Sequence, residues 1–360
     1  MNLKNNLFLE RDCESEYAKN AVLNFINELN FNFKIDMWGS RLKTAHVELY
    51  HRQNLVDVGS GKGFDEDAVI GALFESLEHN FSNSQNHYSE SILVESYNNL
   101  IKQKKIVHVP ISTMGLSFED FPELHEVTTA WVKFKNILSD EEFFMPLYSQ
   151  DPHCSEEFLR QNDKIYEKLL GIGVTLLREG NGISIGMSEH ETILHSLNEQ
   201  IERFSKSLFY KNQMMGDYTS ATLIINLPPF ISENIQDEKF KSKLKLIKLE
   251  NPFEIPTFVS IYQHDDLIYP LVGSGSSLDT NTAILRAVSE CFQLYNLSTK
   301  NDLFNIYKND DERINSLSHR LLDFRRARMF LNIQNKVDNL NNLKKPEIIS
   351  IRKQIELTGR

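Results

Sequence analysis

The sequence predicts an α+β fold in which strands and helices interleave in α/β layers. Some segments repeat their hydrophobic residues with a helical period, and others alternate them with polar residues as strands do. A strand-like apolar run, a glycine-rich turn and an amphipathic helix also follow one another three times. No Ser/Gly-rich linker divides the chain, so we expect one domain over residues 1–360, with an N-terminal part to about 105, a central part to about 235 and a C-terminal part beyond.

The N-terminal part is predicted to open with an amphipathic helix over 12–29, where apolar residues such as Val22, Ile26 and Leu29 share one face. Alternating patterns then predict strands over 31–38, 44–50 and 55–58. The first repeated unit is GSGKGFDEDAVIGALFESLEHNF, from Gly59 to Phe81, whose helix begins with acidic residues that suit the helix dipole. A further helix is expected over 89–102.

The central part carries the second unit, in which a strand over 174–178 and a glycine turn precede GMSEHETILHSLNEQIERF, with a helix over about 189–212. In the third unit, IYPLVGSGSSLDTNTAILRAVSECFQLY from Ile268 to Tyr295, Gly273 and Gly275 are expected to form the turn. The same patterns predict strands over 127–134, 143–148, 221–227 and 256–262, and helices over 155–170, 239–248 and 311–332.

Composition excludes several classes of protein. The 360 residues are 41% hydrophobic and 25% charged, as in ordinary globular proteins. A net charge of -11 argues against nucleic acid or an acidic membrane as a partner held by bulk charge. Cys13, Cys154 and Cys291 are too scattered for a disulfide framework or zinc site, so we expect reduced thiols in the cytoplasm. No signal peptide or apolar span is found.

Acidic pairs recur in the three predicted helices. Glu75 and Glu78 lie three residues apart, as do Glu199 and Glu202, so each pair shares a helix face. Two neighbouring carboxylates repel unless a cation lies between them. A solvated charged face explains a single pair, but recurrence at a similar depth, with Arg286, Glu290 and Gln293 in the third helix, favours one shared cation site. Cys291 is expected to pack in the core rather than act as a nucleophile.

At these three units the chain resembles the YcaO superfamily of ATP-dependent enzymes that modify peptide backbones. GKGFDEDAVIGALFESLEH is similar to its glycine turn and S-x-x-x-E-x-x-E-R helix, GNGISIGMSEHETILHSLNEQIERF to its G-x-G-x-x-x-G and E-x-x-E-R segment, and GSGSSLDTNTAILRAVSECFQ to its R-A-x-x-E-x-x-Q segment. The resemblance spans roughly residues 11–297 and implies a YcaO fold whose three units converge on one nucleotide site.

The resemblance implies the site residues and the cofactors, ATP and Mg²⁺. Departures are Gly71 for the usual Ser, His79 for Arg and Met187 for Asn. Lys62 in GSGKG is similar to a phosphate loop, but the G-x-x-x-x-G-K-[ST] spacing is absent. The implied magnesium ligands are Glu75, Glu78, Glu199, Glu202 and Glu290, and the implied nucleotide contacts are Arg11, Ser184, Glu191, Arg203 and Arg286.

The implied function is ATP-dependent phosphorylation of a backbone amide during the biosynthesis of ribosomal peptide natural products such as bacteriocins. The C-terminal IELTGR differs from the P-x-P-x-P tail of azoline-forming members, so azoline cyclodehydration and thioamide or amidine formation both stay open. An ATP-dependent amide-cleaving peptidase and a non-catalytic subunit are the alternatives. We expect a precursor peptide as substrate, with a separate leader-peptide-binding or sulfur-delivery partner, and a homodimer stays open.

Overall fold

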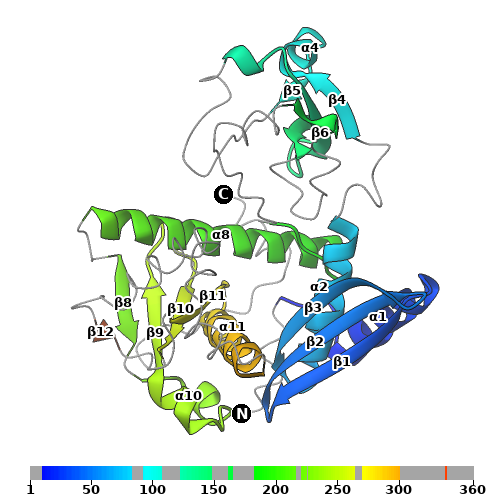
Figure 1. Ribbon diagram of the computed structural model, residues 1–360. Helices are drawn as coiled ribbons and strands as arrows, with labels where there is room; N and C mark the ends of the chain where they lie inside the picture. Colours follow the sequence, from blue (N-terminus) through cyan, green and yellow to red (C-terminus); the bar gives the residue numbers. More distant parts are fainter. Residues whose placement is uncertain are drawn as a thin grey trace, which may run out of the picture. The chain divides into compact units, whose positions relative to one another are not determined.

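The structure is a computed structural model that describes residues 10–82, 92–107, 122–147, 161–164, 182–215, 220–224, 226–263, 270–300 and 337–338. The chain divides into two compact units, Met1–Leu77 with Ser184–Arg360 and Glu78–Ile183. The first unit holds a three-stranded and a five-stranded sheet, and the second holds a four-stranded sheet (Figure 1). The mixed α+β class predicted from the sequence is confirmed.

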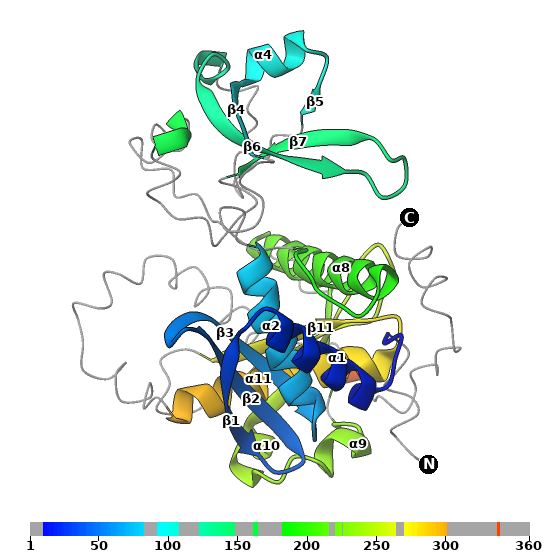
Figure 2. The same cartoon turned by 90° about the vertical axis from the view of Figure 1, so that its right-hand side faces the viewer.

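Unit 1 begins with helix α1 (Ser15–Glu28) and the antiparallel sheet β1-β2-β3, made of Asn32–Gly39, Leu42–His51 and Asn54–Phe64. Helix α2 (Asp67–Ser82) follows; its residues up to Leu77 belong to unit 1 and lie across β3 (Figure 2). Lys19 Nζ of α1 pairs with Glu66 Oε1 at 2.7 Å, which ties α1 to the start of α2. These elements agree with the predicted helices and strands, except that β3 is longer than expected.

The glycines of the first and third repeated sequence segments are strand residues, which corrects the prediction that they form turns. Gly59, Gly61 and Gly63 lie in β3, and Gly273 and Gly275 lie in β11 (Leu271–Ser276). A Cβ atom on Gly61 would lie 1.8 Å from Ala68 O, so the missing side chain lets α2 rest directly on the strand. The glycines therefore set the helix-to-sheet distance rather than reverse the chain.

The C-terminal part of unit 1 forms the sheet β11-β10-β9-β8-β12. Strand β10 (Thr257–Tyr262) is buried at every residue because a helix covers each face. Phe258 and Tyr262 pack toward α11 (Thr280–Lys300), whereas Val259 and Ile261 pack toward α8 (Glu189–Met214). The remaining elements are β8 (Ala221–Ile224), α9 (Pro229–Ser232), α10 (Glu238–Lys243), β9 (Leu244–Leu249) and β12 (Val337–Asp338).

Helix α11 lies between the two sheets of unit 1, in contact with β10 and β11 on one side and with β2 and β3 on the other (Figure 1). Ser260 Oγ donates to Ala287 O at 2.7 Å, and Asn296 Nδ2 donates to Thr44 Oγ1 at 3.0 Å, one contact on each side of the helix. The side chains of α11, the helix of the third repeated segment, therefore reach β3, β11 and α8.

Unit 2 contains the sheet β4-β6-β7-β5, made of Ile92–Ser96, Thr128–Lys135, Glu142–Pro146 and Ile106–Val107, with helix α4 (Tyr97–Lys102) and the 3-10 turn Pro122–Leu124. The predicted helix over 89–102 is wrong in its first half: Ile92–Ser96 is a strand because it pairs with β6, and the β-branched and apolar side chains suit that pairing.

The predicted helix over 239–248 is also too long. It ends at Lys243, and Leu244–Leu249 forms β9, paired with β10. The predicted strand over 174–178, the helix over 311–332 and most of the helix over 155–170 lie outside the described residues.

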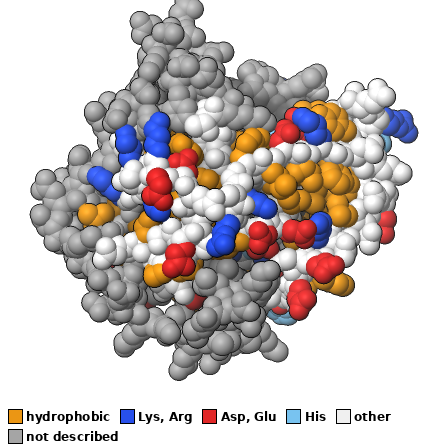
Figure 3. All heavy atoms as spheres, turned by 90° about the horizontal axis from the view of Figure 1, so that it is seen from below, with side chains coloured by type: hydrophobic (Ala, Val, Ile, Leu, Met, Phe, Trp, Pro, Cys, Tyr) orange, Lys and Arg blue, Asp and Glu red, His pale blue; other side chains and the backbone are white. Residues whose placement is uncertain are grey.

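In the part of the chain that is described, no helix is long and apolar enough to cross a membrane. On the face shown in Figure 3, the described residues carry both acidic and basic side chains among apolar ones.

Candidate functional site

The start of α8 holds the first group of predicted site residues. Ser188 precedes the helix, and its Oγ accepts the backbone N–H of Glu191 at 3.1 Å, which caps the helix. The Glu191 carboxylate is buried and turns to the N-terminal segment, where Arg11 Nη1 lies 2.5 Å from Oε1 and Asp12 N–H donates to Oε2 at 3.3 Å. Two predicted nucleotide contacts from distant parts of the sequence are thus brought together.

Ser184, also a predicted nucleotide contact, is used within the loop before α8. Its Oγ donates to Thr192 O at 2.7 Å. A Cβ on the neighbouring Gly186 would approach Thr192 Oγ1 to 3.0 Å, so the loop is closely packed on the first turn of the helix. Because the hydroxyl proton is already donated, Ser184 has to rotate before it can donate to a phosphate.

Arg286 of α11 lies in a second group with a residue that sequence reasoning missed. Its Nη2 lies 2.6 Å from Oε2 of the buried Glu10, and its Nη1 donates to Ser276 O at 3.0 Å. Glu10 Oε1 accepts from Asn198 Nδ2 at 3.1 Å and from Ser277 Oγ. Glu10 therefore holds the guanidinium of Arg286 in one orientation, and no local sequence pattern marks it for this role.

We expect Glu10→Gln to lower the free energy of unfolding by about 2 kcal/mol, because the half-buried guanidinium of Arg286 loses its buried anionic partner while the side-chain shape is kept. Urea denaturation measures this change. Glu28→Gln is the control: Glu28 is exposed at the end of α1, and its replacement is expected to change stability by less than about 0.5 kcal/mol. Equal small changes in both variants would show that the Glu10 pair contributes nothing.

The third group joins α8, β11, α11 and β3 through alternating acids and bases. Glu202 Oε1 accepts from Ser274 Oγ at 2.5 Å and lies 3.1 Å from Lys206 Nζ. Lys206 Nζ also donates to Ser274 Oγ at 2.8 Å. On the other side, Glu290 Oε2 accepts from Ser274 N–H at 3.3 Å and lies 3.2 Å from Lys62 Nζ. Two predicted magnesium ligands from different helices thus meet at one serine.

The neighbouring charges and the extent of burial set the pKa values of Glu202 and His195. Burial alone would raise the pKa of Glu202, but Lys206, the Ser274 hydroxyl and Lys62 outweigh it, so the pKa is lowered and the group is a carboxylate at neutral pH. His195 has Nδ1 3.5 Å from Arg286 Nη2. Its ring reaches solvent, yet the surrounding protein reduces its hydration, and this desolvation, followed by the charge of Arg286, lowers its pKa to about 3. His195 is therefore neutral at pH 7.

The donors at this site fit magnesium in their chemistry. Carboxylate and hydroxyl oxygens are the hard ligands that Mg²⁺ prefers. Glu199 pairs with Arg203 on its own helix, with Nε and Nη2 at 2.9 and 2.8 Å from Oε1, and Glu75 and Glu78 are half-buried on α2. Among the residues that the structure describes, no three His, Cys, Asp or Glu side chains converge closely enough to hold one ion. The five-glutamate ligand set therefore stays a prediction.

Cys291 is fully buried on α11, and this burial raises the pKa of its thiol to about 12, as expected of a packing residue.

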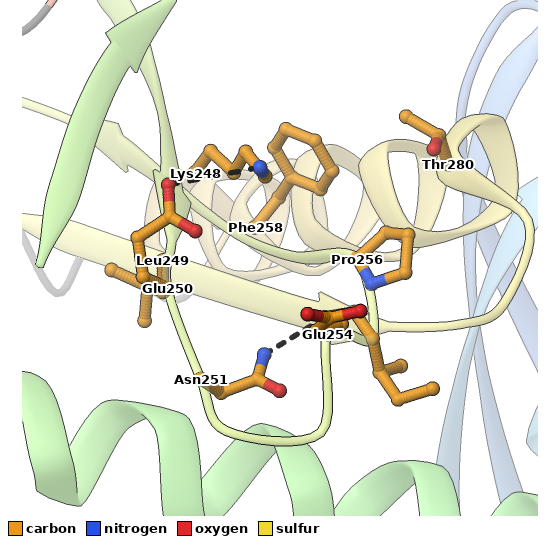
Figure 4. A pocket seen from close by; sticks show the side chains of 9 residues that line it. Lys248, Leu249, Glu250, Asn251, Glu254, Pro256, Phe258 and Thr280 are labelled. Carbon is orange, nitrogen blue, oxygen red and sulfur yellow. Dashed lines mark hydrogen bonds and ion pairs between the residues drawn. The ribbon is translucent and has the colours of Figure 1, made fainter. Parts of the chain in front are cut away.

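A separate cavity of about 340 Å³ lies where the β9–β10 loop meets the first turn of α11 (Figure 4). Lys248, Glu250 and Asn251 line it, and Asn251 Nδ2 donates to Ile255 O at 2.8 Å to hold the loop. None of the predicted site residues lines this cavity.

Residues 60–346 match the family model described as YcaO cyclodehydratase, ATP- and Mg²⁺-binding. No curated protein matches the chain.

Solved structures with a similar fold include YcaO from Methanopyrus kandleri bound with AMPPCP and Mg²⁺, with a TM-score of 0.64 and 14% identity over 97% of this chain and 82% of that chain. A heterocyclase in complex with substrate and cofactor has a TM-score of 0.66 and 16% identity over 97% of this chain, which spans only 48% of the heterocyclase chain. The E. coli microcin synthetase McbBCD complex with pro-MccB17 bound has a TM-score of 0.55 and 15% identity over 88% and 77% of the two chains. At these identities the likeness shows the fold.

Proposed function

The chain belongs to the YcaO family, and from that premise we propose that it is an ATP- and Mg²⁺-dependent enzyme that modifies the backbone of a ribosomally made peptide. The observation that carries the proposal is the meeting of predicted magnesium carboxylates and basic residues within unit 1. Glu202 and Glu290 reach Ser274 from two helices, and Arg286 extends from α11 toward His195 of α8.

The reaction we propose is phosphorylation of a backbone amide. A nucleophile, either a Cys, Ser or Thr side chain of the peptide or an external sulfide or amine, attacks the amide carbon. The resulting oxyanion attacks the γ-phosphorus of ATP and releases ADP, and phosphate then leaves with the former amide oxygen. The chain's task is positioning and charge neutralisation, as in other phosphoryl transfers.

Each group of site residues has a role in this scheme. Bound Mg²⁺ supplies positive charge to the phosphate oxygens, and Glu75, Glu78, Glu199, Glu202 and Glu290 are the residues proposed to hold it. Arg11, Arg203 and Arg286 are proposed to donate to phosphate oxygens, for which a guanidinium is well suited. Glu191 and Glu10 hold Arg11 and Arg286 at 2.5 and 2.6 Å, so both guanidinium groups are oriented before the nucleotide arrives.

The proposed substrate is a precursor peptide presented by a partner protein. The heterocyclase and the microcin synthetase of similar fold were solved with substrate or with other subunits, which supports this arrangement. Azoline cyclodehydration and thioamide or amidine formation are the candidate outcomes.

Product mass tests the proposed function. The chain, its partner and a Cys- and Ser-containing precursor peptide are incubated with ATP and Mg²⁺, with and without added sulfide, and the peptide is analysed by mass spectrometry. Loss of water indicates cyclodehydration, and exchange of oxygen for sulfur indicates thioamide formation; both support the proposal. Addition of water would indicate an ATP-dependent peptidase instead, and an unchanged peptide without ATP turnover would favour a non-catalytic subunit.

A further inference from the structure

Two lysines outside the predicted site pair with two of the predicted magnesium ligands. Lys62 Nζ lies 3.2 Å from Glu290 Oε2, and Lys206 Nζ lies 3.1 Å from Glu202 Oε1. Both pairs belong to unit 1, and the Ser274 backbone and hydroxyl join them into one network. The lysine side chains keep 31% and 23% of their surface exposed, so each can move without unpacking the core.

The fold explains why both lysines point into the site. Gly61 and Gly63 face α2, and side chains alternate along a strand, so Lys62 between them projects from the opposite face of β3, toward α11. Lys206 lies one helical turn after Glu202, and Ser274 of β11 fixes its ammonium beside that carboxylate. Neither lysine belongs to a phosphate-loop motif.

The pairing has a consequence for metal binding. Carboxylates gathered for a metal repel each other when the metal is absent, and a nearby ammonium removes that repulsion. Magnesium requires the same oxygen lone pairs and approaches them to about 2.1 Å, so it has to displace the ammonium first. A displaced lysine remains close to the bound ion, where the phosphates of a nucleotide are the anions available to it.

We propose that Lys62 and Lys206 are exchangeable counter-ions of the metal site. They hold Glu290 and Glu202 in the nucleotide-free protein and turn to phosphate oxygens when Mg²⁺ and ATP bind together. This inference rests on the proposed function, because it takes ATP as the nucleotide. It predicts that the chain binds Mg²⁺ weakly without nucleotide, since the ion gains the carboxylates only when the lysines gain the phosphates.

Calorimetry of Lys62→Met and Lys206→Met tests the proposal through two affinities that are expected to move in opposite directions. Without nucleotide, each variant is expected to bind Mg²⁺ about 10-fold more tightly than the wild type, because the competing ammonium is gone. At saturating Mg²⁺, each is expected to bind ATP about 10-fold more weakly, because one phosphate contact is lost. Lys62→Arg and Lys206→Arg keep the charge and are expected to stay within about 3-fold of the wild type in both titrations.

Lys241→Met is the matched control. Lys241 Nζ pairs with Glu238 Oε1 at 2.5 Å on α10, so the variant removes a similar ion pair where no site residue is predicted. Both of its affinities are expected to equal those of the wild type. Circular dichroism shows whether each variant is folded. If a Met variant does not fold, the corresponding Arg variant is used for the test. An Arg variant whose affinity for ATP falls more than 10-fold would contradict a role that depends on charge.

Two results would overturn the inference. If both affinities fall together in the Met variants, the lysines are structural ion pairs only. If neither affinity changes, the lysines do not meet the metal or the phosphates. A wild type that binds no ATP with Mg²⁺ would instead count against the proposed function, and the Mg²⁺ titration without nucleotide would still decide whether the lysines compete with the metal.

Discussion

Gly61→Ala is expected to lower the free energy of unfolding by about 3 kcal/mol, because the new methyl group would overlap the backbone of α2. Its Cβ would lie 1.8 Å from Ala68 O and 2.3 Å from Ala72 N, where no flexible side chain can yield. To accommodate alanine, α2 has to move away from β3, and the half-buried Glu75 moves with it. Urea denaturation followed by far-ultraviolet circular dichroism measures the loss.

Gly71→Ala provides a matched control on the same interface. Gly71 lies inside α2, and a Cβ there would meet Gly61 Cα at 3.5 Å, an ordinary van der Waals contact. Alanine forms helix better than glycine, so this variant is expected to gain up to about 1 kcal/mol. Replacing glycine by alanine is thus expected to lower the free energy of unfolding on the β3 side of this contact and to raise it on the α2 side. A Gly61→Ala variant as stable as the wild type would show that α2 does not rest directly on β3.

Glu202→Gln is expected to weaken Mg²⁺-dependent ATP binding by about 100-fold, equivalent to about 2.7 kcal/mol. Glutamine keeps the size of the side chain and can still accept from Ser274, but it removes the charge that is proposed to hold the metal. It also leaves Lys206 without its carboxylate partner. Isothermal titration of ATP into the wild type and the variant, with and without Mg²⁺, measures the difference.

Glu238→Gln serves as the control for Glu202→Gln, because Glu238 also pairs with a lysine on a helix but lies on α10, where no site residue is predicted. Its ATP affinity is expected to match that of the wild type. Thermal melts are expected to show that Mg²⁺ with ATP stabilises the wild type well beyond Mg²⁺ alone. Unchanged ATP affinity in Glu202→Gln would remove this residue from the metal site. Absence of ATP binding in the wild type would count against the proposed function of the isolated chain and favour a partner-dependent or non-catalytic role.

Local patterns were sufficient to predict most elements of unit 1. Helix α8 was predicted to within two residues at each end, because its hydrophobic period is a local feature of the sequence. Helix spacing likewise predicted that Glu199 and Glu202 share a face. The errors occur where pairing across the chain overrides local preference: Ile92–Ser96 and Leu244–Leu249 were expected to be helical and are strands, since β6 and β10 lie beside them.

The sequence by itself determined the class of fold, through hydrophobic patterns within single segments, and the resemblance of three motifs to the YcaO superfamily implied the family and the residues expected at the site. Only the tertiary structure decided which side chains meet. Glu10 reaches Arg286, and Lys62 reaches Glu290, across most of the length of the chain. No local sequence pattern encodes contacts between residues so far apart along the chain. For Lys62, the packing of β3 between α2 and α11 decides the contact, because the glycines of β3 face α2 and the lysine between them faces α11.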